Sequence, residues 1–469
     1  MVFSSHAFLV FMLVLLAVYG LVSRFAPRHC KATLIVASLV FYGFWIPKYL
    51  VLLGLSLAFN YVLSGGLTGP GSEGRKRLLL WIGVTCNLAL IGYYKYLDFL
   101  IGGLNGVFEL SMPLQQIVLP IGISFFTFQQ IGYLVDVYEK KTERPSAANY
   151  VFFIAFFPQL IAGPIVQQSH FLPQVQAKTD WSLRADHVGL GLALFSMGLF
   201  KKTVLADNIG RYSDAIFVSA QTQAIGTLDA WMAAIGYSFQ IYFDFSGYSD
   251  MAIGLGLMFG FIFAKNFDAP YRAESITDFW RRWHISLSTW LREYLYIPLG
   301  GNRGSEARTY FNLVLTMLLG GLWHGASWNF IIWGGIHGGM LAAERAAGRE
   351  NFYKRLPRPF RIGVTFVIVM LGWVFFRAAD LPRALGYLAD MFGARALPDG
   401  ARLISGVLFQ PYLLLALALA ALVVWAGRQT WDWTQRLSLG KAALCIALGW
   451  LALVVLATQE YNPFIYFIF

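Results

Sequence analysis

Long apolar segments recur along most of this 469-residue chain, and they limit the folds open to it. About 20 consecutive apolar residues are enough for an α-helix to cross a bilayer. Hydrophobic residues make up 57% of the chain and charged residues 13%, whereas soluble domains carry about 25% charged residues. The sequence therefore predicts an all-α, polytopic membrane protein with about ten to thirteen membrane segments.

We expect one membrane domain over residues 1–469, with a core at about 117–345 and C-terminal helices at 346–469. No Lys or Arg precedes the first apolar segment and Arg24 follows it, so we interpret it as a first span rather than a signal peptide. The net charge of +11 is the excess of Lys and Arg typical of cytoplasmic loops and does not indicate nucleic acid. Three widely spaced cysteines form no disulfide or metal pattern.

Clusters of Lys and Arg predict which loops face the cytoplasm. Two such clusters, Lys265–Arg308 and Arg345–Arg361, enclose 36 residues that must leave the cytoplasmic face and return to it. Each arm is shorter than the ~20 residues of an upright crossing. We therefore expect a hairpin that turns at its glycines and carries His324 deep into the bilayer. If one cluster is not cytoplasmic, His324 lies instead at the interface.

The glycines expected to form this turn are Gly320, Gly321 and Gly325, because glycine tolerates tight backbone geometry. Another apolar segment is interrupted at Gly163-Pro164, where a re-entrant loop buried in protein is possible.

Residues Ser275–Leu299 are predicted to form one amphipathic helix at the cytoplasmic interface or in the mouth of the helix bundle. Ser275 followed by Asp278 is typical of a helix start. Apolar residues recur at helical spacing along one face, and Arg281 and Arg292 fall on the other. His284 lies at the border of the apolar face, which predicts that it points toward the protein.

His324 is the first candidate for chemistry, within the segment LWHGA. A neutral imidazole suits a general base that removes a proton from an acceptor hydroxyl during attack on an acyl thioester. The alternative is a histidine that only binds a neighbouring helix. His284, in RRWHIS, could position substrate, orient His324, or be an interfacial helix residue. His337 reads as a core histidine.

Asp244 and Asp250 are six residues apart, which turns a helix by about 240° and excludes a carboxylate pair. We expect ion pairing with Arg281, Arg282 or another cation near the site. Several arginines could hold a phosphorylated donor at the cytoplasmic mouth, although the positive-inside rule explains the same residues. These arginines are Arg272, Arg281, Arg282, Arg292 and Arg303.

Long segments around these residues resemble the membrane-bound O-acyltransferase (MBOAT) superfamily, in particular the bacterial branch that acylates exported polymers. The matching segments are MVFSSHAFL, LPIGISFFTFQQIGYLVDVY, FFPQLIAGPI, YFDFSGYSDMAIGLGLMFGF, NFDAPY, SITDFWRRWHISLSTWLREYLYIPLGGNR, NLVLTMLLGGLWHGASWNFIIWGGIHG and NPFIYF. The signature histidine of the family falls on His324, and a second tunnel histidine of the polysaccharide branch falls on His284.

The resemblance implies a ring of tilted transmembrane helices with re-entrant segments around a central tunnel, and an O-acyltransferase, by this likeness an O-acetyltransferase. An acyl group would pass from a cytoplasmic thioester, acetyl-CoA or another, across the bacterial inner membrane to acetylate an exported polysaccharide such as alginate. A periplasmic or membrane-anchored acetyltransferase partner would receive it. No covalent cofactor and no metal are implied.

We place six residues around the two histidines as substrate-binding or supporting groups: Trp323, Asp244, Tyr248, Asp250, Arg281 and Arg282. Two other functions stay open at this stage. A transporter or flippase would move donor or polymer without acyl chemistry, and an enzyme of the same fold could acylate a lipid or a protein.

Overall fold

The computed structural model describes residues 1–348, 355–397, 410–458 and 464–465, and these residues form helices and loops without a β-strand. Most of the segment NPFIYF at the end of the chain lies outside the described residues. The predicted all-α class is confirmed for the described part of the chain.

Six helical segments within the described residues are long and apolar enough to cross a membrane. They are α1 (His6–Phe25), α3 (Tyr49–Thr68), the helix over Glu73–Phe108, the helix over Ala185–Ser219, α17 (Arg358–Arg377) and α22 (Leu439–Thr458). The chain is thus a multi-pass membrane protein, with fewer such helices than the ten to thirteen segments expected.

The difference from the expected number has local causes. The apolar residues 33–63 fall in two helices with a turn near Pro47 between them, and the first of these, α2 (Cys30–Gly43), is too short to span upright while α3 is long enough. Other expected segments form helices too short to span upright, such as α6 (Ile123–Tyr138) with 16 residues.

The described chain divides into two compact units. Unit 1 comprises residues 1–195 and 248–264, and unit 2 comprises residues 196–247 and 265–469. Two helices, α10 (Ala185–Phe200) and α12 (Thr227–Met258), contribute residues to both units. The predicted single membrane domain stays a prediction.

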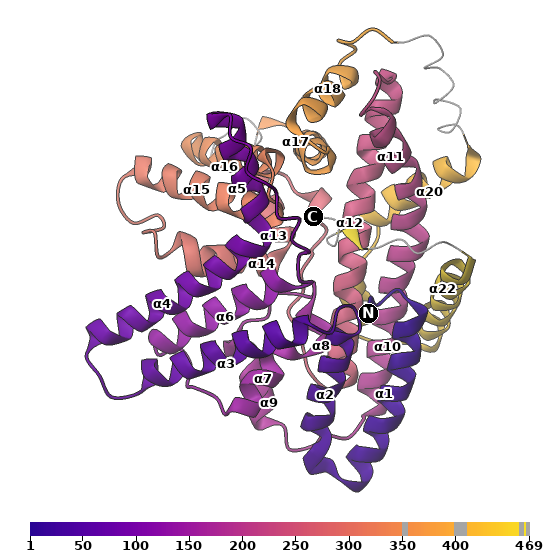
Figure 1. Cartoon of the computed structure of the whole chain (residues 1–469). Helices are drawn as coiled ribbons and strands as arrows, with labels where there is room; N and C mark the ends of the chain where they lie inside the picture. Colours follow the sequence, from indigo (N-terminus) through magenta and orange to yellow (C-terminus); the bar gives the residue numbers. More distant parts are fainter. Residues whose placement is uncertain (349–354, 398–409, 459–463, 466–469) are drawn as a thin grey trace. The chain divides into compact units, whose positions relative to one another are not determined.

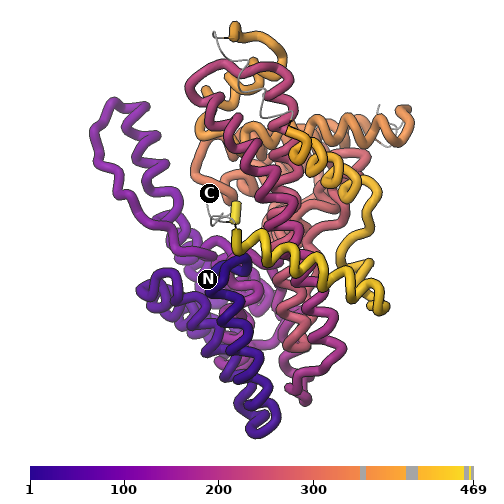
Figure 2. Tube along the Cα trace, turned by 90° about the vertical axis from the view of Figure 1, so that its right-hand side faces the viewer, coloured from indigo at the N-terminus to yellow at the C-terminus, as the bar shows by residue number. Residues whose placement is uncertain are grey.

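Unit 1 contains two groups of packed helices. The helices α1 and α2 run antiparallel and are joined by a short turn (Figures 1 and 2). A second group is formed by α3, α4 (Glu73–Ile91) and α6, which lie side by side (Figure 1). Buried amides hold it together: Asn60 and Asn87 exchange hydrogen bonds across α3 and α4. Such polar contacts between apolar helices stabilise membrane helix packing.

The interruption at Gly163-Pro164 is present. The short helix α8 (Phe157–Leu160) ends before it and α9 (Gln168–Ala177) begins after it. Residues 161–166 are buried although they are not helical. A Cβ on Gly163 would lie 2.6 Å from the Cα of Gln159, so glycine is required by close backbone approach. Whether this segment is re-entrant stays a prediction.

The predicted hairpin is present in unit 2. Helix α15 (Glu306–His324) packs along α16 (Trp328–Ala346), with the turn at residues 325–327 (Figure 1). The turn was wrongly expected to include Gly320 and Gly321, which lie inside α15. A Cβ on Gly321 would lie 2.1 Å from the carbonyl oxygen of Phe330. This glycine therefore serves close packing of the two helices rather than the turn.

Candidate active site

The segment around His284 is a broken helix, and the prediction of one helix over Ser275–Leu299 is wrong. Ser275 caps α13 (Ile276–Arg282) as expected, since its Oγ accepts from the backbone N–H of Asp278 at 3.1 Å. A second helix, α14 (Ile285–Leu291), begins after His284. The backbone of His284 is left-handed, with φ 44° and ψ 55°, a conformation uncommon outside glycine and often found at functional sites.

A short neighbouring segment holds this kink in place. The backbone N–H of Ile285 donates to the carbonyl oxygen of Asn266 at 2.9 Å, and that of Asp268 donates to Arg282 at 2.9 Å. These two bonds lie on either side of His284, whose side chain is fully buried. The expected inward orientation of His284 is confirmed, but the kink rather than helical periodicity produces it.

The side chain of Asn266 orients the imidazole of His284. Its Oδ1 accepts from the backbone N–H of Ser286 at 3.2 Å and from the Ser286 hydroxyl at 2.8 Å, so this atom is the amide oxygen. The same oxygen lies 3.2 Å from Nδ1 of His284. Nδ1 must therefore carry the proton, which leaves Nε2 as the nitrogen that can accept one.

Burial also sets the charge of His284, which lies outside the six candidate spans. Desolvation lowers the pKa of His284 to about 3, so its resting form is neutral. A neutral imidazole with a fixed tautomer can orient its neighbours by hydrogen bonding.

His324 is the last residue of α15 and is 5% exposed. Its ring centroid lies 6.4 Å from that of His284. Aromatic rings surround it, with Trp323 at 5.0 Å, Trp333 at 5.2 Å and Phe376 at 5.3 Å between centroids. The two histidines are therefore close enough to share one substrate, as expected, while the passage that they were predicted to line stays a prediction.

The predicted supporting residues divide between the two units. Trp323 belongs to unit 2 and lies 6.1 Å from the ring of His284. Tyr248 and Asp250 belong to the part of α12 in unit 1. There Tyr248 stacks on Phe3 at 4.5 Å, and Asp250 is buried.

Asp244 pairs with a lysine and not with an arginine of the α13 region. The Nζ of Lys202 lies 2.5 Å from Oδ1 of Asp244 and 2.7 Å from Oδ1 of Asp207. All three side chains are at most 9% exposed. The expected pairing with Arg281 or Arg282 is thus wrong, and the alternative of another cation is correct. The next residue, Phe245, places its ring edge-on to His284 at 4.7 Å.

The arginines proposed to hold a donor are used in different ways. Arg282 pairs with Asp278 at 2.9 Å, and Arg272 donates to the carbonyl oxygens at the end of α20 (Pro411–Trp425). The side chain of Arg281 is exposed. Arg303 is exposed as well, so both Arg281 and Arg303 are accessible to a soluble ligand.

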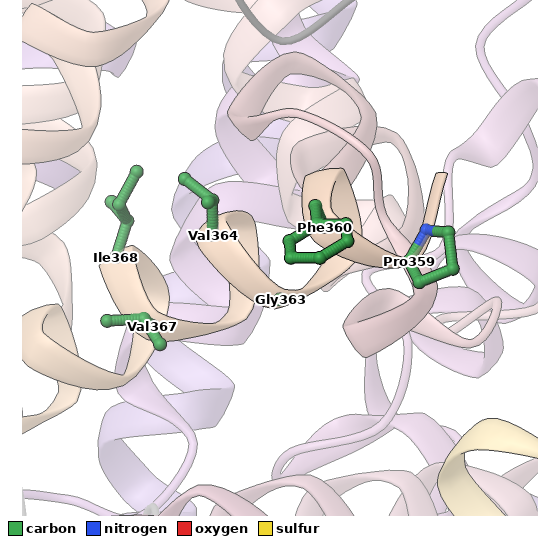
Figure 3. A pocket seen from close by; sticks show the side chains of 6 residues that line it. All are labelled: Pro359, Phe360, Gly363, Val364, Val367 and Ile368. Atoms are coloured by element: carbon green, nitrogen blue, oxygen red, sulfur yellow. The ribbon is translucent and has the colours of Figure 1, made fainter. Parts of the chain in front are cut away.

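One apolar groove lies apart from the residues of this site. It has a volume of about 510 Å³ and lies along α17, lined by Pro359, Phe360, Gly363, Val364, Val367 and Ile368 (Figure 3). Its lining carries no titratable side chain, so it suits contact with apolar chains rather than catalysis. No cluster of three metal-ligating side chains occurs among the described residues.

Residues 133–378, which include both histidines and Asn266, match the family of membrane-bound O-acyltransferases (MBOAT). The chain belongs to this family. As an MBOAT protein it is an O-acyltransferase, and several of its relatives are named as O-acetylases or O-acetyltransferases.

Three relatives show how far the similarity to MBOAT proteins extends. A protein of Pseudomonas aeruginosa named "probable alginate O-acetylase AlgI" is 46% identical, covering 84% of this chain and 75% of the relative. Its Pseudomonas putida counterpart is 41% identical over the full length of both chains. The peptidoglycan O-acetyltransferase of Helicobacter pylori is 44% identical, covering 78% of this chain and 74% of the relative.

Two residues of this MBOAT site were missed by sequence reasoning. Asn266 lies in a segment that carries the family resemblance, but nothing local shows that its oxygen meets His284. Glu344 of α16 accepts from the backbone N–H groups of Ile276 at 2.6 Å and Thr277 at 2.9 Å. It therefore caps α13 from a distant part of the chain.

Proposed function

We propose that this enzyme moves an acetyl group from a cytoplasmic thioester across the bacterial inner membrane for O-acetylation of an exported polysaccharide such as alginate. The relatives named above support acetyl as the group and an envelope polymer as the final acceptor. The observation that carries the proposal is the pair of buried imidazoles, His284 and His324, 6.4 Å apart between ring centroids.

In the proposed reaction, the hydroxyl of an acceptor attacks the carbonyl carbon of the acetyl thioester. His324 takes the hydroxyl proton as the new C–O bond forms. The C–S bond then breaks, and the leaving sulfur receives the proton as a thiol. His284, neutral and held by Asn266, positions the acceptor or His324, so that atoms and charge balance without a metal or a bound cofactor.

The family resemblance supplies the setting for this reaction. We infer a ring of tilted helices with re-entrant segments around a central tunnel, in which donor and acceptor reach His324 from opposite faces. Acetyl-CoA or another thioester would enter from the cytoplasm near Arg281. A periplasmic or membrane-anchored acetyltransferase partner would then place the acetyl group on the polymer.

Mass spectrometry of the exported polymer tests the proposal. Cells that lack this chain should export polymer without O-acetyl groups, and the wild-type chain should restore them. His324→Gln should fail to restore them at equal membrane abundance, with a rate loss of about 10²–10⁴-fold. Exposed His29→Gln is the matched control and should behave as wild type.

The same experiment addresses the other functions. A transporter or flippase should retain partial function with His324→Gln, because it performs no proton transfer. Acylation of a lipid or protein would leave the polymer unchanged and place the acetyl label in the lipid or protein fraction. Either result would contradict the proposed function.

A further inference from the structure

A third buried histidine of unit 2, His337, forms a polar cluster with two tryptophans that the proposed reaction does not use. Nε1 of Trp280 lies 3.2 Å from Nδ1 of His337. An indole N–H can only donate, so Nδ1 accepts and the proton of the neutral imidazole is on Nε2. The Nε2 of His337 is therefore a hydrogen-bond donor.

A second donor lies next to it. Trp333 is one helical turn before His337 on α16, and the two ring centroids are 4.9 Å apart. Both side chains are at most 1% exposed. Within the described part of the chain, neither Nε1 of Trp333 nor Nε2 of His337 has a hydrogen-bond partner. Buried donors are seldom left unsatisfied, because their desolvation is costly.

The two donors converge on one backbone position of the neighbouring helix. A Cβ on Gly372 of α17 would lie 3.4 Å from Nε2 of His337 and 3.6 Å from Nε1 of Trp333. Gly372 adds no side chain between them. Both nitrogens therefore lie within 3.6 Å of the same position beside α17.

Aromatic rings surround this region, and the ring of Trp333 links it to the candidate active site. Trp373 stacks on Trp333 at 5.6 Å, and Phe279 stacks on His337 at 6.0 Å. The ring centroid of the donor Trp333 also lies 5.2 Å from that of His324. An acceptor bound between the donors would be close to the proposed chemistry in an environment that excludes bulk water.

We propose that Trp333 and His337 form a two-donor site for a single oxygen acceptor beside Gly372. The acceptor is either the carbonyl oxygen of the acetyl group or an ordered water molecule. In the first case, which rests on the proposed function, the donors stabilise the negative charge that develops on this oxygen during attack. In the second case, the water completes the polar core between α16 and α17.

Two cryo-electron microscopy maps that resolve water test the site, one of the enzyme alone and one with acetyl-CoA added to the His324→Gln variant. Density about 2.7–3.2 Å from both nitrogens in both maps identifies a resident water. Density only in the presence of acetyl-CoA identifies the acetyl carbonyl. Absence of density in both maps would overturn the proposal, whatever reaction the enzyme performs.

Kinetics of three variants separate a role in binding an acceptor from simple packing. Trp333→Phe removes one donor and keeps a ring, and Gly372→Ala puts a methyl group against both donors. If the site binds the acetyl carbonyl, each should lower kcat by about 10²-fold, the scale of losing one such donor, with KM changed less. Gly363→Ala is the control on the same helix, since its methyl group would meet no atom within 4 Å.

The outcome for a resident water is different. Both variants should then lower the melting temperature while kcat falls less than about 10-fold, well short of the loss of an oxyanion donor. Wild-type kcat and wild-type melting temperature in both variants would contradict either form of the site.

Discussion

Oδ1 of Asn266 lies 3.2 Å from Nδ1 of His284 and accepts a hydrogen bond from the hydroxyl of Ser286 at 2.8 Å. One buried atom thus sets both the tautomer of the imidazole and the first turn of α14. Two backbone hydrogen bonds, from Ile285 to Asn266 and from Asp268 to Arg282, hold the left-handed backbone of His284. The orientation of His284 therefore depends on a residue 18 positions earlier in the chain.

Asn266→Ala should impair the enzyme more than it destabilises it. Loss of the acceptor leaves buried donors on His284 and Ser286 and should cost about 1–3 kcal/mol of stability. Misplacement of the imidazole should lower acetyl transfer on the order of 10²-fold. Transfer rate and melting temperature should be measured together, with exposed Asn302→Ala as control. Near wild-type transfer by Asn266→Ala would show that this contact does not orient the site.

Charge reversal at two adjacent arginines should have different effects. Arg281 is exposed, so Arg281→Glu should leave the melting temperature unchanged and raise the KM for the thioester roughly 5-fold, the scale of one exposed charge interaction. Arg282→Glu should lower the melting temperature, because it turns the ion pair with Asp278 into a repulsion. Arg77→Glu, at an exposed position of α4, is the control and should leave both the KM and the melting temperature unchanged. An unchanged KM for Arg281→Glu would argue against donor entry at this face.

Lys202→Met should strongly destabilise unit 2. The lysine pairs with Asp207 and Asp244, and removal of one partner from a buried ion cluster typically costs about 3–5 kcal/mol. Thermal unfolding in detergent measures the effect. Simultaneous Asp207→Asn and Asp244→Asn should recover part of the loss, since no uncompensated charge then remains. The exposed pair Arg184–Asp186 supplies the control Arg184→Met, which should unfold as wild type does.

Gly321→Ala should separate α15 from α16. Its methyl group would lie 2.1 Å from the carbonyl oxygen of Phe330, so the helices must move apart, at a cost of about 1–3 kcal/mol. Because His324 ends α15, acetyl transfer should fall as well. Gly339→Ala on α16 meets no atom within 4 Å and should retain both stability and transfer. Equal behaviour of the two variants would mean that the hairpin tolerates a wider spacing.

The sequence by itself determined the features that depend on local interactions. Apolar segments of spanning length predicted an all-α membrane protein, and the Ser275 cap and the α15–α16 hairpin could be read from residues near each other in the chain. The family, and with it the O-acyltransferase activity, followed from long matching segments that carry both histidines. Helices are formed by hydrogen bonds four residues apart, which is why local patterns suffice for them.

Only the tertiary structure decided how the site is held. It broke the expected helix at His284, because the pairing of residues 266–268 with 282–285 outweighs the helical periodicity. It paired Asp244 with Lys202, and it placed Gly321 in a helix contact rather than a turn. It also brought Trp333 and His337 to Gly372. Each of these depends on contacts between separate segments of the chain, which the spacing within one segment does not encode.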